Sequence, residues 1–80
     1  MRLDKFLKVS RIIKRRTVAN EACDAGRVVV NGKPARASYE VKIGDVLELT
    51  LGARTLKARV TDVKEYTKKE DAELLYEIIG

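Results

Sequence analysis

The sequence predicts a small α+β domain: two N-terminal helices joined by a basic turn, a small antiparallel β-sheet and a C-terminal helix. Apolar residues recur at helical spacing near the N-terminus, alternate with polar residues after residue 45, and return to helical spacing after residue 67. A chain of 80 residues can bury one modest core, so we expect a single domain over residues 1–80.

The first helix is predicted over residues 2–9. Leu3, Phe6 and Leu7 fall at positions i, i+3 and i+4, and basic residues lie between them. This pattern buries one stripe of the helix and exposes a basic one. We place a turn between Ser10 and Arg16, where the apolar stripe loses its register.

The second helix is short. Thr17 is a plausible N-cap because its hydroxyl can accept from the free amides of the first turn. Val18, Ala19, Ala22 and Cys23 form a narrow apolar face, and Gly26 stands where a left-handed residue ends a helix. Cys23 has no cysteine partner and lies on this face, so we interpret it as a buried packing residue.

A hairpin follows the second helix. Residues 28–30 are three valines, and Asn31 and Gly32 form the preferred dipeptide of a type I′ turn. The return arm, residues 33–36, contains Pro34, which cannot donate to a ladder and so belongs at a sheet edge.

Two further strands and a helix complete the predicted chain. Residues 46–51 and 55–63 alternate in polarity, with residues 52–54 as the loop between them. Thr67 and Glu70 have the spacing of a capping box, and apolar residues follow at helical intervals, so we expect a helix over residues 67–79.

Positive charge is concentrated in the first half of the chain. Residues 1–36 contain ten Lys or Arg against three acids, a net charge of +7, whereas residues 37–80 have a net charge of −2. One-sided basic charge is typical of polyanion-binding proteins, although it also serves solubility alone. The N-terminus lacks the apolar core of a signal peptide, no apolar run could span a membrane, and the cysteine is single, so we expect a cytoplasmic protein.

The sequence contains no histidine, which excludes histidine-based catalysis and imidazole metal sites. No Gly-rich loop has nucleotide-binding spacing, and we expect no enzyme activity, catalytic residue, metal or cofactor. Arginine forks, hydroxyls and amides instead suit phosphates and ribose hydroxyls, which favours RNA. Tyr39, Tyr66 and Tyr76 lie outside the basic half, so we expect recognition of helical shape rather than base stacking.

Residues 2–36 resemble the S4 domain, a small RNA-binding module. The resemblance rests on Arg-Leu-Asp at residues 2–4, Ser-Arg at 10–11, Arg-Thr at 16–17 and Gly-x-Val-x-Val-Asn-Gly at 26–32. It implies a helical RNA-binding motif over residues 2–36, a β-rich half over 37–66 and the C-terminal helix. Within that family, a free-standing chain of this size is most similar to ribosome-quality-control factors of Gram-positive bacteria, with heat-shock protein fifteen as the next relative.

This resemblance implies binding to large ribosomal subunits obstructed by peptidyl-tRNA, with contacts to ribosomal RNA and tRNA. It also implies support for a partner protein that adds alanine tails to stalled nascent chains. We expect a monomer that does not bind membranes. The RNA-binding residues implied by position are Arg2, Lys5, Lys8, Ser10, Arg11, Lys14, Arg15, Arg16, Thr17 and Asn20, with Arg27, Asn31 and Lys33 as weaker candidates.

Two alternatives remain open on the sequence. The first is a rescue factor like heat-shock protein fifteen, which recycles the same obstructed subunits. The second is an adaptor whose acidic half, including the C-terminal helix, docks another protein while the basic charge is incidental. Asp4 stands among cations, where a carboxylate commonly orients a neighbouring arginine.

Overall fold

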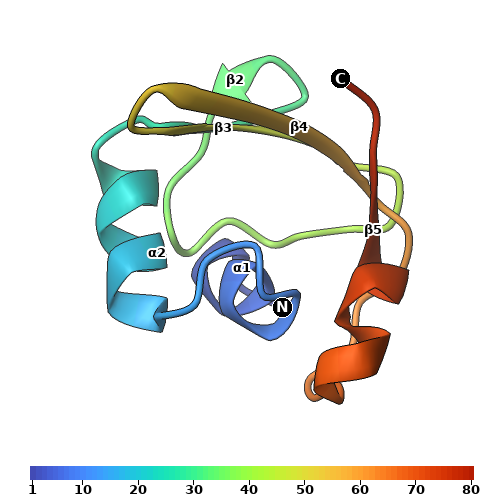
Figure 1. The fold of residues 1–80 in the computed structure, drawn as a ribbon. Helices are drawn as coiled ribbons and strands as arrows, with labels where there is room; N and C mark the ends of the chain where they lie inside the picture. Colours follow the sequence, from blue (N-terminus) through green and yellow to red (C-terminus); the bar gives the residue numbers. More distant parts are fainter.

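Five antiparallel strands form one sheet in the order β2-β1-β3-β4-β5, and the computed structural model describes all residues 1–80. Figure 1 shows α1 and α2 on one side of this sheet, with η1, a 3-10 helix, beyond α1. The predicted α+β class with a small antiparallel sheet is confirmed. The elements are α1 (Leu3–Val9), α2 (Arg16–Asp24), β1 (Val28–Val30), β2 (Lys33–Pro34), β3 (Val46–Leu51), β4 (Arg54–Val60), η1 (Lys69–Leu75) and β5 (Tyr76–Ile78).

The core lies between the helices and the sheet. Leu3, Phe6 and Leu7 of α1 are fully buried, as are Leu47 and Leu49 of β3. Helical spacing on one side and alternation on the other therefore direct apolar side chains into one cluster. None of the helices has the length and apolar character needed to cross a bilayer.

The end of α2 and the following hairpin adopt the predicted conformations. Gly26 has φ 78°, and the Arg27 N–H donates to the Ala22 carbonyl at 3.0 Å, which closes the helix with a Schellman motif. Asn31 and Gly32 have φ values of 52° and 84°, as a type I′ turn requires. Pro34 lies on the edge strand β2, as predicted.

Cys23 is buried on the inner face of α2, as predicted. Its residue surface is 2% exposed, and burial raises the pKa of the thiol to about 11, with the charges of Asp4 and Asp24 adding to the effect. The thiol therefore remains neutral in the folded protein and serves as a small apolar packing group.

The predicted helix over residues 67–79 is wrong in its length and type. The 3-10 helix η1 ends at Leu75, and Tyr76–Ile78 form β5, which pairs with Ala58–Val60 of β4. This pairing satisfies the backbone groups of β4 that would otherwise lie at a sheet edge. The predicted capping box does not form either, because Lys68 is the N-cap and no side chain caps η1.

Two smaller boundaries also differ from the prediction. α2 begins at Arg16 with Arg15 as N-cap, so Thr17 lies inside the first turn and its hydroxyl does not cap the helix. The Ala19 N–H already donates to the Arg15 carbonyl at 3.0 Å, which starts the helical ladder two residues earlier than a cap at residue 17 allows. Strand β4 starts at Arg54 and stops at Val60, because the Thr61 N–H turns away to the Leu75 carbonyl.

Candidate RNA-binding surface

A hollow of about 750 Å³ opens between α1, the turn after it and the segment that leads into η1. Two hydrophobic residues are among the ten that line it. Six cations surround the hollow, and Glu65 is the one acidic residue in its lining. These cations are Lys5, Lys8, Arg11, Lys14, Arg16 and Lys69.

The packing of α1 sets the direction of its basic side chains. Leu3, Phe6 and Leu7 are buried against the sheet, so the intervening Lys5 and Lys8 project from the opposite face. The same amphipathic pattern that builds the core therefore supplies the first two cations of the hollow.

The basic turn after α1 is held in an unusual backbone conformation. Arg11 has φ 62°, in the left-handed region that glycine normally occupies. Its N–H donates to the Lys8 carbonyl at 3.1 Å, and the buried Ile13 donates to the Leu7 carbonyl at 3.1 Å. The helix thus ends in a tight turn that keeps a cation at a position favourable to glycine.

Ser10 lies inside this turn and not on its surface. It is 1% exposed, and its hydroxyl donates to the Leu7 carbonyl at 3.3 Å. The hydroxyl therefore satisfies a carbonyl at the end of α1. The structure removes Ser10 from the set of side chains that could touch RNA.

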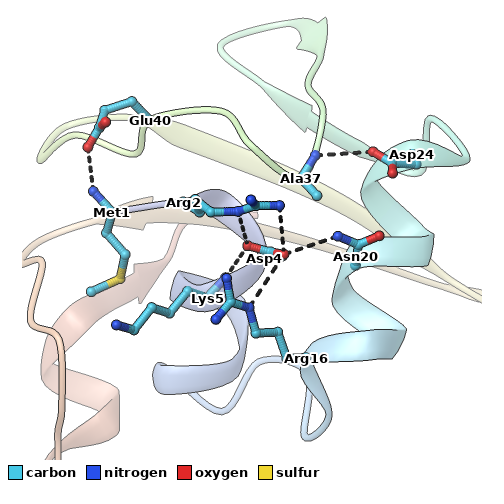
Figure 2. A network of polar contacts seen from close by, with 9 residues as sticks. All are labelled: Met1, Arg2, Asp4, Lys5, Arg16, Asn20, Asp24, Ala37 and Glu40. Carbon is cyan, nitrogen blue, oxygen red and sulfur yellow. Dashed lines mark hydrogen bonds and ion pairs between the residues drawn. The ribbon is translucent and has the colours of Figure 1, made fainter.

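Asp4 is the centre of a polar network between α1 and α2 (Figure 2). Its carboxylate accepts from Arg2 Nε at 3.2 Å, from Arg2 Nη2 at 3.3 Å and from Asn20 Nδ2 at 3.1 Å. Arg16 Nε lies 3.5 Å from Asp4 Oδ2. The Asp4 side chain is 3% exposed, whereas those of Arg2 and Arg16 are 51% and 47% exposed, so a buried anion holds two surface guanidinium groups.

The Asp4 carboxylate is ionised despite its burial. Burial alone raises its pKa, but hydrogen bonds from Asn20, Arg2 and the Lys5 N–H, together with the charge of Arg16, outweigh this effect. The pKa of Asp4 therefore lies below its ordinary value. The expectation that Asp4 orients a neighbouring arginine agrees with this geometry.

Most cations of the hollow have no anionic partner. Lys5 pairs with Glu65, and Arg16 pairs with Asp4. None of the remaining four is in an ion pair of the structure. Unpaired positive charge around a concave surface attracts a polyanion. The four are Lys8, Arg11, Lys14 and Lys69.

The structure divides the other predicted binding residues among separate places. Thr17 and Asn20 lie in a second hollow that adjoins Arg16, so they neighbour the main one. Arg27 lies beside the end of α2 and β3. Asn31 and Lys33 lie at the β1–β2 hairpin. Arg2 and Arg15 are exposed but line none of these hollows.

Asn31 has a structural role in a second polar network. Its side-chain oxygen accepts from the Val46 N–H at 2.9 Å, and its amide donates to Asp45 Oδ1 at 3.0 Å. Asp45 also accepts from the Tyr39 hydroxyl at 2.9 Å and the Lys42 N–H at 3.0 Å. Burial raises the pKa of Asp45, but these hydrogen bonds hold it below its ordinary value. The network ties the hairpin to the start of β3.

Five residues of the hollow were not among the predicted binding residues: Val9, Glu65, Tyr66, Thr67 and Lys69. Tyr66, Thr67 and Lys69 follow β4 and lie far along the chain from the basic half, yet they line the same hollow. The Lys5–Glu65 ion pair joins this segment to α1. A basic residue and an exposed aromatic in a short connection were the available signals, but they do not reveal which surface the connection faces.

The helix pair, the basic turn and the small sheet define a compact α+β module of the S4 type. The S4 domain family model matches residues 1–47, which include α1, α2 and the first hairpin. The chain is 56% identical over 80 residues to the RQC P-site tRNA stabilizing factor of Streptococcus pneumoniae, covering all of this chain and 91% of that protein. It is 52% identical to the factor of the same name from Bacillus subtilis, covering 99% and 92% of the two chains.

The fold agrees with a solved relative. The trimeric structure of heat shock protein 15 from Vibrio cholerae superposes with a TM-score of 0.92 at 29% identity, covering 99% of this chain and 81% of that one. The chain therefore belongs to the S4 domain family and, within it, to the family of RQC P-site tRNA stabilizing factors.

Proposed function

We propose that this protein is an RNA-binding ribosome-quality-control factor. It binds large ribosomal subunits that are obstructed by peptidyl-tRNA and stabilises the tRNA in the P site. It contacts ribosomal RNA and tRNA through the basic hollow, and it supports alanine tailing of the stalled chain by a partner protein. It acts without catalysis, as a cytoplasmic monomer folded as one domain over residues 1–80.

The observation that carries this proposal is the clustering of six cations around one hollow, four of them without an anionic partner. Phosphate contacts by Lys and Arg supply much of the affinity of nucleic-acid-binding proteins. The full-length identity to P-site tRNA stabilizing factors supports the choice of target.

The start of α2 adds to the binding potential of the hollow. No side chain caps this helix, so its first amides are free to donate, and the dipole there favours an anion. Arg16 lies at that end and borders both the main hollow and the smaller one that contains Thr17. A phosphate at this position would meet a guanidinium, a hydroxyl and backbone amides.

The experiment is sedimentation with obstructed large subunits. The protein should cosediment with subunits that carry peptidyl-tRNA, more weakly with vacant subunits, and dissociate as the salt concentration rises. The double variant Lys8→Glu with Lys14→Glu should abolish the association. The matched control, Lys42→Glu with Arg54→Glu, makes the same change in charge at exposed positions outside the hollow and should retain it.

Two results would contradict the proposal. The first is equal loss in the two double variants, which would mean that binding depends only on total charge. The second is association that persists in high salt and is unaffected by either variant, which would favour the adaptor alternative. Equal binding to vacant and obstructed subunits would remove the P-site tRNA from the proposal.

A further inference from the structure

We propose that Tyr66 is a base-stacking residue, so that the basic hollow holds an unpaired nucleobase beside the phosphates of an RNA helix. This inference rests on the proposed RNA-binding function and specifies the kind of RNA that the site recognises. It differs from the expectation drawn from the sequence, which favoured recognition of helical shape alone.

Tyr66 differs from the other tyrosines in its surroundings. Tyr39 and Tyr76 pack against the core, and the Tyr39 hydroxyl donates to Asp45. Tyr66 is 79% exposed, more than any other large hydrophobic residue in the chain, and its hydroxyl makes no hydrogen bond within the protein. The ring therefore contributes little to the stability of the fold and is free to meet a ligand.

Tyr66 is exposed at the basic hollow. Tyr66 lines the hollow together with Lys5 and Lys8 of α1, and Lys69 lies in the same lining. Glu65 precedes Tyr66 in the sequence, and its ion pair with Lys5 joins this part of the chain to α1. An aromatic ring among unpaired cations is the combination by which proteins hold an unstacked base and the phosphates that flank it.

Other ligands for this ring are less consistent with the hollow. An apolar peptide would need apolar walls, but the lining contains two hydrophobic residues and six cations. A uniform RNA duplex presents phosphates to the cations but no aromatic face to Tyr66, because its bases are stacked. A bulged or terminal nucleotide supplies both groups at once.

The test compares two RNA hairpins with the same stem, one fully paired and one with a single unpaired nucleotide. The unaltered protein should bind the bulged hairpin more tightly. Base–aromatic stacking contributes roughly 1 to 3 kcal/mol, so Tyr66→Ala should weaken binding to the bulged hairpin by about 5- to 150-fold. Binding to the paired hairpin and both salt slopes should stay unchanged, and Tyr66→Phe should behave like the unaltered protein.

Two controls make the outcome specific. Ile43 is 66% exposed and lies outside the hollow. Ile43→Ala therefore removes an exposed apolar side chain and should leave binding to both hairpins unchanged. Arg16→Ala should weaken binding to both hairpins and flatten the dependence of both affinities on salt concentration. The melting temperatures of the Tyr66 variants should equal that of the unaltered protein, because the ring is exposed.

The inference is overturned if the unaltered protein binds the two hairpins equally, or if Tyr66→Ala retains the preference for the bulged one. It is also overturned if Tyr66→Ala weakens binding to both hairpins and flattens the dependence of affinity on salt concentration. In each case, weaker RNA binding by Arg16→Ala would still support the proposed function. Failure of the unaltered protein to bind either hairpin or the obstructed subunit would instead reject RNA binding.

Discussion

Asp4 Oδ2 lies 3.5 Å from Nε of Arg16, and this contact joins the buried start of α1 to the exposed start of α2. The same carboxylate holds Arg2. A guanidinium held by a buried anion is restricted to fewer rotamers, so it loses less conformational entropy when it meets a phosphate. The position of the arginine, as well as its charge, therefore contributes to binding.

The first prediction separates position from charge. Asp4→Asn raises the net charge by one unit, which on its own would strengthen RNA binding. We expect the opposite, a weaker affinity, because Arg2 and Arg16 lose their common anchor. The loss of charge-assisted hydrogen bonds should also lower the free energy of unfolding by about 1.5 to 3 kcal/mol. Affinity is measured by titration with RNA and stability by urea denaturation.

Glu73→Gln is the matched control for Asp4→Asn. Glu73 is exposed and makes no ion pair, and its replacement by Gln raises the net charge by the same one unit. It should leave stability unchanged and affect RNA affinity only slightly. An Asp4→Asn protein that binds RNA more tightly than Glu73→Gln would show that the anchor has no role in binding.

The second prediction concerns Arg11, whose φ of 62° is unfavourable for residues other than glycine, asparagine and aspartate. Arg11→Gly relieves this strain and should stabilise the fold by about 1 kcal/mol. It also removes an unpaired cation from the hollow and should weaken RNA binding roughly tenfold. Arg11→Asn, which tolerates the left-handed region but is neutral, should bind as weakly as Arg11→Gly. A glycine variant with lower stability than the unaltered protein would exclude strain at this turn.

The third prediction is acid sensitivity. The pKa values of Asp4 and Asp45 lie below their ordinary values in the folded protein, so the unfolded chain binds more protons as the pH falls. Their contribution is complete above the unfolded pKa of about 4 and is lost progressively as the pH falls through the lower folded values. Thermal melts followed by circular dichroism should show a falling melting temperature below about pH 5.

Asp45→Asn tests the origin of this sensitivity. The variant should be less stable at neutral pH and should lose less stability on acidification, since one of the two carboxylates is absent. An identical acid dependence in Asp45→Asn and the unaltered protein would mean that other carboxylates control it.

The sequence was most informative where local rules decide the structure. The stripe of Leu3, Phe6 and Leu7 predicts α1, and the Asn31-Gly32 dipeptide predicts the hairpin, because each conformation depends on residues close in sequence. The prediction of a C-terminal helix was wrong for the last residues because Tyr76–Ile78 form a strand that pairs with β4. Such pairing depends on an open sheet edge that is formed by residues elsewhere in the chain.

Local reasoning also limited the prediction of the site. Lys5, Lys8, Arg11, Lys14 and Arg16 follow one another closely in the chain, and the structure brings them to one hollow. Arg27, Asn31 and Lys33 lie elsewhere, although they belong to the same basic half. Tyr66 joins the hollow only through the fold, so no spacing rule could associate it with α1.

The most direct test of the RNA-binding hollow compares Arg16→Ala with Arg54→Ala on obstructed large subunits over a range of salt concentrations. Arg54 is exposed at the start of β4, outside every hollow described, and carries the same charge. Arg16→Ala should weaken binding about ten- to hundred-fold per folded molecule and flatten the slope of log affinity against log salt by just under one unit. Arg54→Ala should change neither quantity. Equal losses in the two variants, with unchanged slopes, would contradict a defined binding site and leave only diffuse charge.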